Sequence, residues 1–382
     1  MFAKFSRFRK VFLVMGVLFV VVATSVCCMA GEITVKDAWD REVVIPENVT
    51  KVICSGPGCL RYLVYLQAQE QDLVVGVDSV EQKKTRFDAR PYSIAHPELR
   101  EKSLFGEFRG FDNPELIVAL DPAPQVIFKT YASRGHDPVE LQKKTGIPVV
   151  VLEHGQLGVG KKQMDETLML MGRIIGQEQR AKEVIAFFDD AIEDLRKRTA
   201  DIPEEKRPTC YVGGIAYSGP HGISSTEPAY PPFVFLNAKN IAGDPSKSSA
   251  DQLQQTTFSI ESLVSMDPDK IFVDLSTLQG GAEVNGLYQI RDEAVFQVLS
   301  AVEKGEIYGV LPYNWYSQNH GSILADAYFI GKVLYPDRFK DIDPVKKADE
   351  IYTFLVGKPV FEKMNKAFGG MVFQKIDLSK VE

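Results

Sequence analysis

Polar and aromatic side chains follow the ends of several predicted strands, where a parallel sheet places its ligands. The predicted strands 125–128, 210–215 and 307–311 are each followed by tyrosine, tryptophan or arginine residues. In open parallel α/β sheets, ligands bind outside the carboxyl ends of the strands. Aromatic rings offer apolar contact area, and arginine binds anionic groups through a forked pair of hydrogen bonds. We therefore predict that the ligand-binding residues are Tyr131, Arg134, Tyr217, Tyr230, Trp315 and Tyr316. The alternative for several of the tyrosines is a place in the core.

The residue pattern carries no recognisable catalytic constellation. It contains no G-x-S-x-G, no phosphate-binding loop and no G-x-G-x-x-G. The histidines are scattered, and no cluster of cysteine and histidine has metal-ligand spacing. We predict a protein that is not an enzyme and has no catalytic residue, no protein-bound metal and no cofactor. The alternative is an exported metal-dependent enzyme, which would need a convergent set of ligands such as His136, Glu153 and His154.

One helix near the middle of the chain is predicted to join two halves. From 179 to 200 the apolar residues recur at the period of one helix face, and the opposite face is charged. No glycine or proline interrupts this pattern, and prolines follow its end. A helix of roughly 20 residues spans about 30 Å, the diameter of a small domain. We interpret it as a rigid strut between two lobes. The alternative is an ordinary surface helix in one large domain.

Strands and helices alternate on both sides of this strut, which predicts the α/β class with parallel sheets. The segment 81–108 is polar and contains two prolines, so we predict a loop region. A last helix is expected from 344 to about 368, with a weak point at Gly357-Lys358-Pro359. The predicted organisation is residues 1–30 as an export signal, 31–160 as the N-terminal lobe, 161–205 as the helical connection and 206–382 as the C-terminal lobe.

The first thirty residues have the layout of a secretory signal. Four basic residues precede an apolar run from Val11 to Val26, and small residues lead to Ala30. Cys27 and Cys28 raise the alternative of a lipoprotein, and an uncleaved anchor is a third interpretation. The net charge of the whole chain is −7, and residues 1–30 contain no acid, so the remainder is more acidic still. This balance argues against nucleic acid as a partner.

Three cysteines remain after the predicted signal: Cys54, Cys59 and Cys210. An odd number in an exported chain is not a complete disulfide framework. A bridge between Cys54 and Cys59 is compatible with the sequence, which leaves the question open.

Several segments resemble substrate-binding proteins of ABC importers, of the class that takes iron–siderophore, haem and vitamin B12. The opening ITVKDAWDREVVIPENVTKVI is similar to the mature N-terminus of that family, although Trp39-Asp40-Arg41 lacks its usual glycine. The segments 73–77, 113–122, 171–181 and 259–273 are similar to further family motifs. The resemblance covers most of residues 31–300 and implies two similar α/β lobes, a single linking helix and a ligand in the cleft between the lobes.

The resemblance also implies a partner and a ligand class. One surface glutamate in each lobe of these proteins pairs with arginines of the membrane permease, and the matching residues are Glu115 and Glu261. The expected ligand is a metal chelate, with iron–siderophore as first choice and haem, a corrinoid or another metal chelate as alternatives. We expect a monomer, located in the periplasm or at the cell surface. A surface-anchored receptor for another protein is the remaining alternative.

Overall fold

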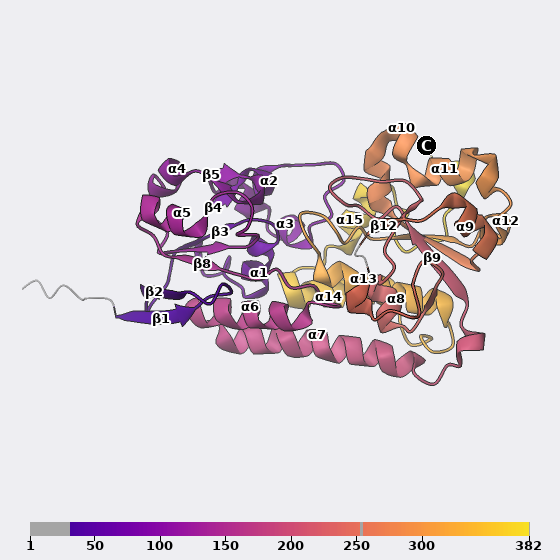
Figure 1. The fold of residues 1–382 in the computed structure, drawn as a ribbon, viewed down its shortest axis with the longest axis horizontal. Helices are drawn as coiled ribbons and strands as arrows, with labels where there is room; N and C mark the ends of the chain where they lie inside the picture. The colour runs from indigo at the N-terminus through magenta and orange to yellow at the C-terminus, as the bar shows by residue number, and fades with distance from the viewer. Residues whose placement is uncertain (1–30, 253–254, 382) are drawn as a thin grey trace, which may run out of the picture.

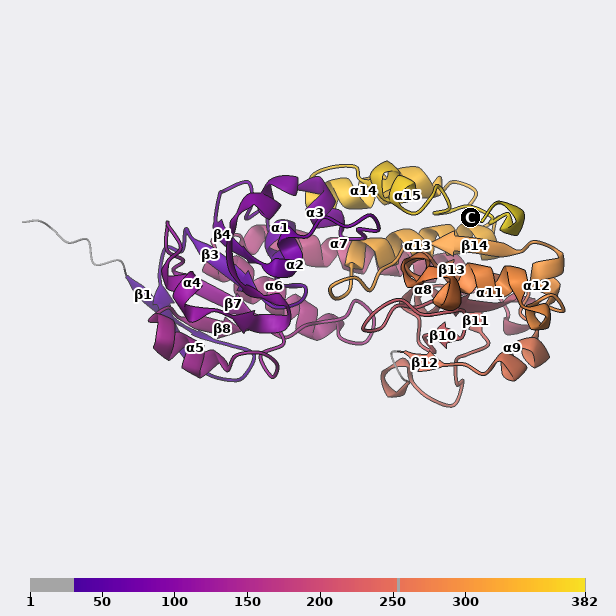
Figure 2. The same cartoon turned by 90° about the horizontal axis from the view of Figure 1, so that it is seen from above.

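The computed structural model describes residues 31–252 and 255–381. Two α/β lobes lie side by side, and one long helix runs along both of them (Figure 1 and Figure 2). The predicted fold class is therefore confirmed. The predicted signal at 1–30, with Cys27 and Cys28, lies outside the described residues. Within the described part of the chain, no helix is both long and apolar enough to cross a membrane.

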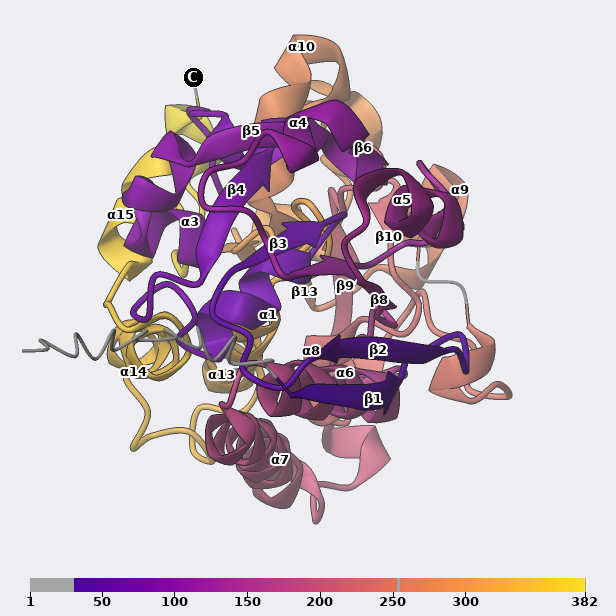
Figure 3. The same ribbon diagram turned by 90° about the vertical axis from the view of Figure 1, so that its left-hand side faces the viewer.

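The N-terminal lobe contains a six-stranded sheet of order β6-β5-β4-β3-β7-β8. All neighbouring strands are parallel except β5 and β6. The strands are β3 (Val52–Ser55), β4 (Val74–Asp78), β5 (Ser103–Glu107), β6 (Phe111–Asp112), β7 (Val126–Lys129) and β8 (Val149–Val151). The helices are α1 (Cys59–Tyr65), α2 (Ser79–Gln82), α3 (Pro91–Ala95), α4 (Pro114–Val118) and α5 (Pro138–Thr145). A separate antiparallel hairpin, β1 (Glu32–Lys36) and β2 (Glu42–Pro46), lies below the sheet in Figure 3.

The C-terminal lobe contains a four-stranded parallel sheet of order β11-β9-β13-β14. Its strands are β9 (Thr209–Gly213), β11 (Lys239–Asn240), β13 (Lys270–Asp274) and β14 (Ile307–Val310). A small antiparallel pair is formed by β10 (Ser225–Thr226) and β12 (Thr256–Thr257). The helices of this lobe are α8 (Pro231–Phe235), α9 (Ile260–Met266), α10 (Gly281–Val284), α11 (Gly286–Asp292), α12 (Ser300–Glu303), α13 (His320–Leu334), α14 (Pro344–Val356) and α15 (Phe361–Ala367).

Helices α6 (Lys161–Ile174) and α7 (Glu178–Thr199) connect the lobes. The predicted strut covered residues 179–200, so helix α7 begins and ends one residue earlier than predicted. Its buried face includes Phe188, whose ring lies 6.1 Å from that of Tyr65 in α1 and 5.9 Å from that of His320 in α13. One aromatic side chain of α7 thus contacts both lobes. The division of the chain into lobes and helical connection at residues 160 and 205 remains a prediction.

The C-terminal helices form a second connection between the lobes. His96 contacts the carbonyl oxygen of Val356 through Nε2 at 2.8 Å, and Nζ of Lys358 donates to the carbonyl of Ala95 at 2.6 Å. The expected weak point ends α14, because Gly357 adopts a left-handed conformation with φ 74° and α15 begins only at Phe361.

The prediction of a loop region over 81–108 is wrong, because this segment contains β5 and several short helical turns. Pro91 and Pro97 stand at the start of helical turns, where the absent amide hydrogen costs nothing. Phe105 is completely buried in the N-lobe sheet. Prolines that suggested interruption therefore mark starts of helical turns.

Candidate functional site

The candidate site lies where the segment 313–319 of the C-terminal lobe meets the N-terminal lobe. This segment, which we call the cleft loop, follows β14 and leads directly into α13. It contacts residues at or after the carboxyl ends of N-lobe strands, including Asp78 at the end of β4 and His154 after β8. The sheet edge that was expected to bind ligand is thus the edge that faces the other lobe.

Arg61 of α1 is the central cation of this site and is only 1% exposed. Its Nε donates to Oδ1 of Asn319 at 3.1 Å. Its Nη2 donates to three consecutive carbonyl oxygens of the cleft loop, those of Trp315, Tyr316 and Ser317, at 3.4, 3.2 and 3.4 Å. Nη1 is buried and has no hydrogen-bond partner among the described residues. Arg61 was not among the predicted site residues, although a charge inside the apolar run Leu60–Leu63 was a usable signal.

Tyr316 links the cleft loop to the N-terminal lobe. Its hydroxyl donates to Oδ2 of Asp78 at 2.5 Å and accepts from the backbone amide of Arg109 at 3.3 Å. Burial raises the pKa of Asp78 to about 7, and the nearby carboxyl group of Glu81 adds to this increase. The protonation state of Asp78 therefore determines how strongly its carboxyl group accepts the hydrogen bond from Tyr316.

His154 lies against the same loop. One of its ring nitrogens makes a short hydrogen bond with Oγ of Ser317, and its ring lies 5.1 Å from that of Tyr131. Burial lowers the pKa of His154, and the positive charge of Arg61 lowers it further. The imidazole is therefore neutral at physiological pH, so one of its ring nitrogens can donate a hydrogen bond and the other can accept one.

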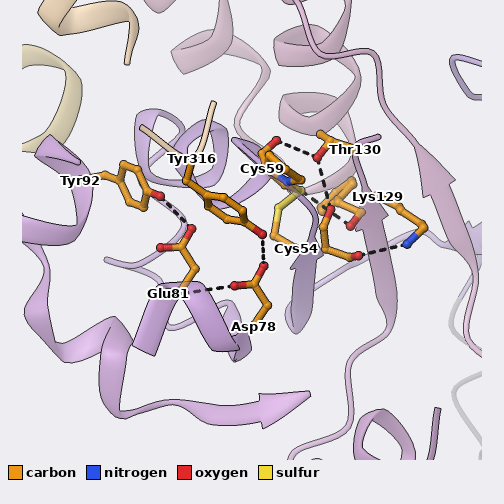
Figure 4. The surroundings of a disulfide bond; sticks show 11 residues. Cys54, Cys59, Asp78, Glu81, Tyr92, Lys129, Thr130 and Tyr316 are labelled. Atoms are coloured by element: carbon orange, nitrogen blue, oxygen red, sulfur yellow. Dashed lines mark hydrogen bonds between the residues drawn. A yellow bond between two sulfur atoms is a disulfide. The ribbon is translucent and has the colours of Figure 1, made fainter. Parts of the chain in front are cut away.

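A disulfide between Cys54 and Cys59 closes the turn beside this site (Figure 4). The turn connects the end of β3 to the start of α1, so the bridge restrains the position from which Arg61 extends. Thr130 donates from its hydroxyl to the carbonyl of Pro57 at 2.9 Å. The structure thus decides the pairing that the sequence left open, and it leaves Cys210 as a buried thiol.

The predicted ligand-binding residues occupy three different environments. Tyr131, Trp315 and Tyr316 lie together at the cleft, and the guanidinium of Arg90 lies 4.8 Å from the Trp315 ring. Arg134 and Tyr217 are exposed. Tyr230 is completely buried against Phe233 and Tyr313, within the C-lobe core. That any of the six binds ligand stays a prediction.

A second buried polar group lies in the C-terminal lobe. Glu227, Asp274 and Asp326 are each at most 3% exposed. Tyr313, the first residue of the cleft loop, makes a short hydrogen bond to Oε2 of Glu227. Burial raises the pKa of Glu227 to about 8 and that of Asp274 to about 7, and it raises the pKa of Asp326 as well. Burial therefore favours the protonated, neutral form of each of these carboxyl groups.

Comparisons with known proteins place this geometry in a family. The profile described as "Periplasmic binding protein" matches residues 64–312. This match covers more than half of the chain. The chain belongs to the periplasmic binding protein family.

Individual relatives of this binding protein differ in the ligands for which they are named. The Molybdate-binding protein MolA of Haemophilus influenzae is 25% identical over 352 residues, covering 83% of this chain and 89% of MolA. The Iron-uptake system-binding protein of Bacillus subtilis is 24% identical over 148 residues, covering 37% of this chain and 43% of that protein.

Solved structures show the same fold. MolA bound to molybdate has a TM-score of 0.63 at 19% identity and covers 86% of this chain and 98% of MolA. A periplasmic solute binding protein from Veillonella parvula has a TM-score of 0.65 at 17% identity and covers 88% of this chain and 97% of that chain.

The two glutamates expected to dock on the permease occupy equivalent positions in the two lobes of the binding protein. Glu115 is exposed in the first turn of α4, which is capped by the side chain of Asn113. Glu261 is exposed in the first turn of α9, which is capped by the side chain of Ser259. An acid at a helix start is stabilised by the helix dipole, so both side chains are held near the protein surface.

The residues named for the alternative metal-dependent enzyme are not gathered in one place. His136 and Glu153 are exposed, whereas His154 is partly buried against Tyr131 and Ser317. Across residues 31–252 and 255–381, no group of three or more histidine, cysteine, aspartate or glutamate residues is arranged to hold a metal ion. The matching family model and the relatives from Haemophilus influenzae and Bacillus subtilis are named as binding proteins.

Proposed function

We propose that this protein captures a metal-containing anion between its lobes, outside the cytoplasmic membrane, and delivers it to an ABC permease. The observation that carries the proposal is Arg61. Its guanidinium is buried at the lobe boundary, beside His154 and the cleft loop, and all of its hydrogen-bond acceptors are neutral. A buried positive charge costs free energy unless it is paired. An anionic ligand would supply the missing charge.

The names of the relatives support a metal-containing ligand. One relative is named for iron uptake and another for molybdate, while the solved neighbours include haem-binding proteins and a complex with nickel and histidine. The sequence resemblance suggests an iron–siderophore as the ligand, with haem, a corrinoid or another metal chelate as alternatives. All of these belong to the wider class of metal-containing ligands. Delivery would use Glu115 and Glu261, because exposed charges set the orientation and rate of association.

Capture from a complex medium tests this proposal. Residues 31–382 would be incubated with the growth medium of the source cells, re-isolated and analysed for bound metals by mass spectrometry. Uptake of the same metal would then be compared in cells with and without the gene. We expect one metal to be retained in a stoichiometric amount and its uptake to fall without the gene. Retention of no metal, with unchanged metal uptake in the deletion, would contradict the proposal.

A further inference from the structure

The two fully buried arginines of the N-terminal lobe have different hydrogen-bond partners. Arg90 is completely buried and is paired with Glu81 and with Asp88, each at 2.9 Å. Arg61 is equally buried but has only neutral oxygen acceptors. The nearby Glu81 is already committed to Arg90 and to the hydroxyl of Tyr92. Arg61 thus forms no ion pair with a carboxylate among the described residues, and its charge is offset only by the more distant Glu81 and by the ring of Tyr92, whose centroid lies 5.2 Å from the guanidinium carbon.

The acceptors on Arg61 come from a strained piece of backbone. Tyr316 and Ser317 have positive φ values of 47° and 71°, a region that side chains other than glycine rarely adopt. Such conformations are energetically costly and gather at ligand sites. Their carbonyl oxygens converge on one nitrogen at long distances, and the other terminal nitrogen has no partner. The carbonyl oxygens of the cleft loop therefore form only weak hydrogen bonds with Arg61. A guanidinium group can instead bind an oxyanion through two parallel hydrogen bonds.

The space around Arg61 is small. A Cβ atom added to Gly58 would lie 3.2 Å from Nη1 of Arg61 and 3.3 Å from the ring of His154. The lobes are also held together beside the site by Tyr316 on Asp78 and, farther away, by Lys358 on Ala95. A bulky planar or branched ligand would need all of these contacts to separate. A compact ligand needs only the cleft loop to move, together with loss of the hydrogen bond from Tyr316 to Asp78.

We propose that Arg61 is the ligand-binding cation of this site and that it takes a compact oxyanion, whose oxygens replace the carbonyls of residues 315–317 on the guanidinium. This inference rests on the proposed function and narrows its ligand class. Release of the carbonyls lets the cleft loop leave its strained conformation, so part of the binding free energy comes from the loop. The hydroxyl of Ser317 and the neutral ring of His154 lie beside the vacated position and can hydrogen-bond the anion.

Fluorescence titration of residues 31–382 tests the proposal, because Trp315 lies in the moving loop and Trp39 is 42% exposed in the separate hairpin region. The probes are sodium molybdate, sodium sulfate, sodium phosphate, a ferric siderophore and haemin. We expect saturable binding of molybdate, the metal-containing oxyanion among the probes, while sulfate and phosphate test whether the metal is required. Arg61→Gln should weaken it by about 100-fold or more, since a charged hydrogen-bond donor is lost. Arg61→Lys keeps the charge but loses the fork, and should weaken it by about 10-fold.

The matched control is Arg86→Gln, which removes an exposed arginine of the same lobe and should leave affinity unchanged. Circular dichroism would establish that each variant is folded, and Arg61→Lys keeps the test usable if Arg61→Gln does not fold. The proposal is overturned if no oxyanion binds, or if oxyanion affinity is the same in a folded Arg61 variant. Tight binding of haemin or the siderophore, unchanged in the Arg61 variants, would also overturn it while leaving the importer function standing.

Discussion

Arg61 of the N-terminal lobe donates from Nε to the side-chain oxygen of Asn319 in the C-terminal lobe, 3.1 Å away and 258 positions later in the chain. The amide nitrogen of Asn319 donates in turn to the carbonyls of Tyr313 and Trp315, at 3.2 and 3.3 Å. One completely buried amide thus fixes both the arginine and the loop that lies on it. This contact positions the proposed ligand site before any ligand arrives.

Asn319→Ala should therefore destabilise the protein. The substitution removes three hydrogen bonds and leaves the buried Nε of Arg61 without its acceptor. We expect the free energy of unfolding to fall by about 2–4 kcal/mol. Urea denaturation followed by circular dichroism measures this change. Asn48→Ala, at an exposed position, is the control and should stay within about 0.5 kcal/mol of wild type. Equal stability of the two variants would show that Asn319 does not anchor the loop.

Glu115→Ala and Glu261→Ala should separate transport from binding. Both side chains are exposed at helix starts, away from Arg61, so ligand affinity should be unchanged. Uptake by cells that carry the double variant should fall at least about 10-fold, because charge pairs set docking orientation. Glu140→Ala removes a comparable first-turn acid from α5 and should leave uptake intact. A parallel loss of affinity would place the two glutamates in the ligand site instead.

The disulfide should contribute measurably to stability. Cys54 and Cys59 close a short loop, for which the chain-entropy relation gives about 2 kcal/mol. Urea denaturation of the wild type with dithiothreitol should show a loss of this size relative to non-reducing conditions. The variant Cys54→Ala/Cys59→Ala should show no response to dithiothreitol. A response of that variant equal to the response of the wild type would assign the effect to something other than this bridge.

Stability should decrease as pH rises through neutrality. Burial raises the folded-state pKa of Asp274 from its ordinary 3.8 to about 7, so the folded protein holds a proton that the unfolded chain releases. The stabilising contribution of this group is complete below its unfolded pKa and is lost as pH rises through about 7. One such group changes the free energy of unfolding by at most about 1.4 kcal/mol per pH unit.

Asp274→Asn tests this assignment because the amide does not titrate. Between about pH 5 and about pH 8, the variant should lose less stability than the wild type in urea denaturation. Asp377→Asn is the control, since the pKa of this exposed carboxyl is lowered to about 2 and it stays ionised throughout this range. Parallel pH profiles for wild type and Asp274→Asn would refute a titrating Asp274.

The sequence by itself determined the elements whose pattern is local. The apolar period of 179–200 predicts α7 to within one residue at each end, because every turn of a helix repeats the same face. Asn113 caps α4 through its side chain, and Asp343 caps α14, as their residue types indicate. The segments that resemble importer binding proteins likewise placed the chain in its family.

Only the tertiary structure decided which side chains share the site. Tyr230 and Tyr316 both follow strands in the sequence, yet the first lies in the core and the second bonds to Asp78 across the cleft. Arg61 looked like part of an apolar helix, and its partners come from the other lobe. The spacing of apolar residues along a segment predicts only the secondary structure of that segment and which of its faces is buried. The burial and pairing of a charge depend on segments hundreds of residues away, which only packing brings together.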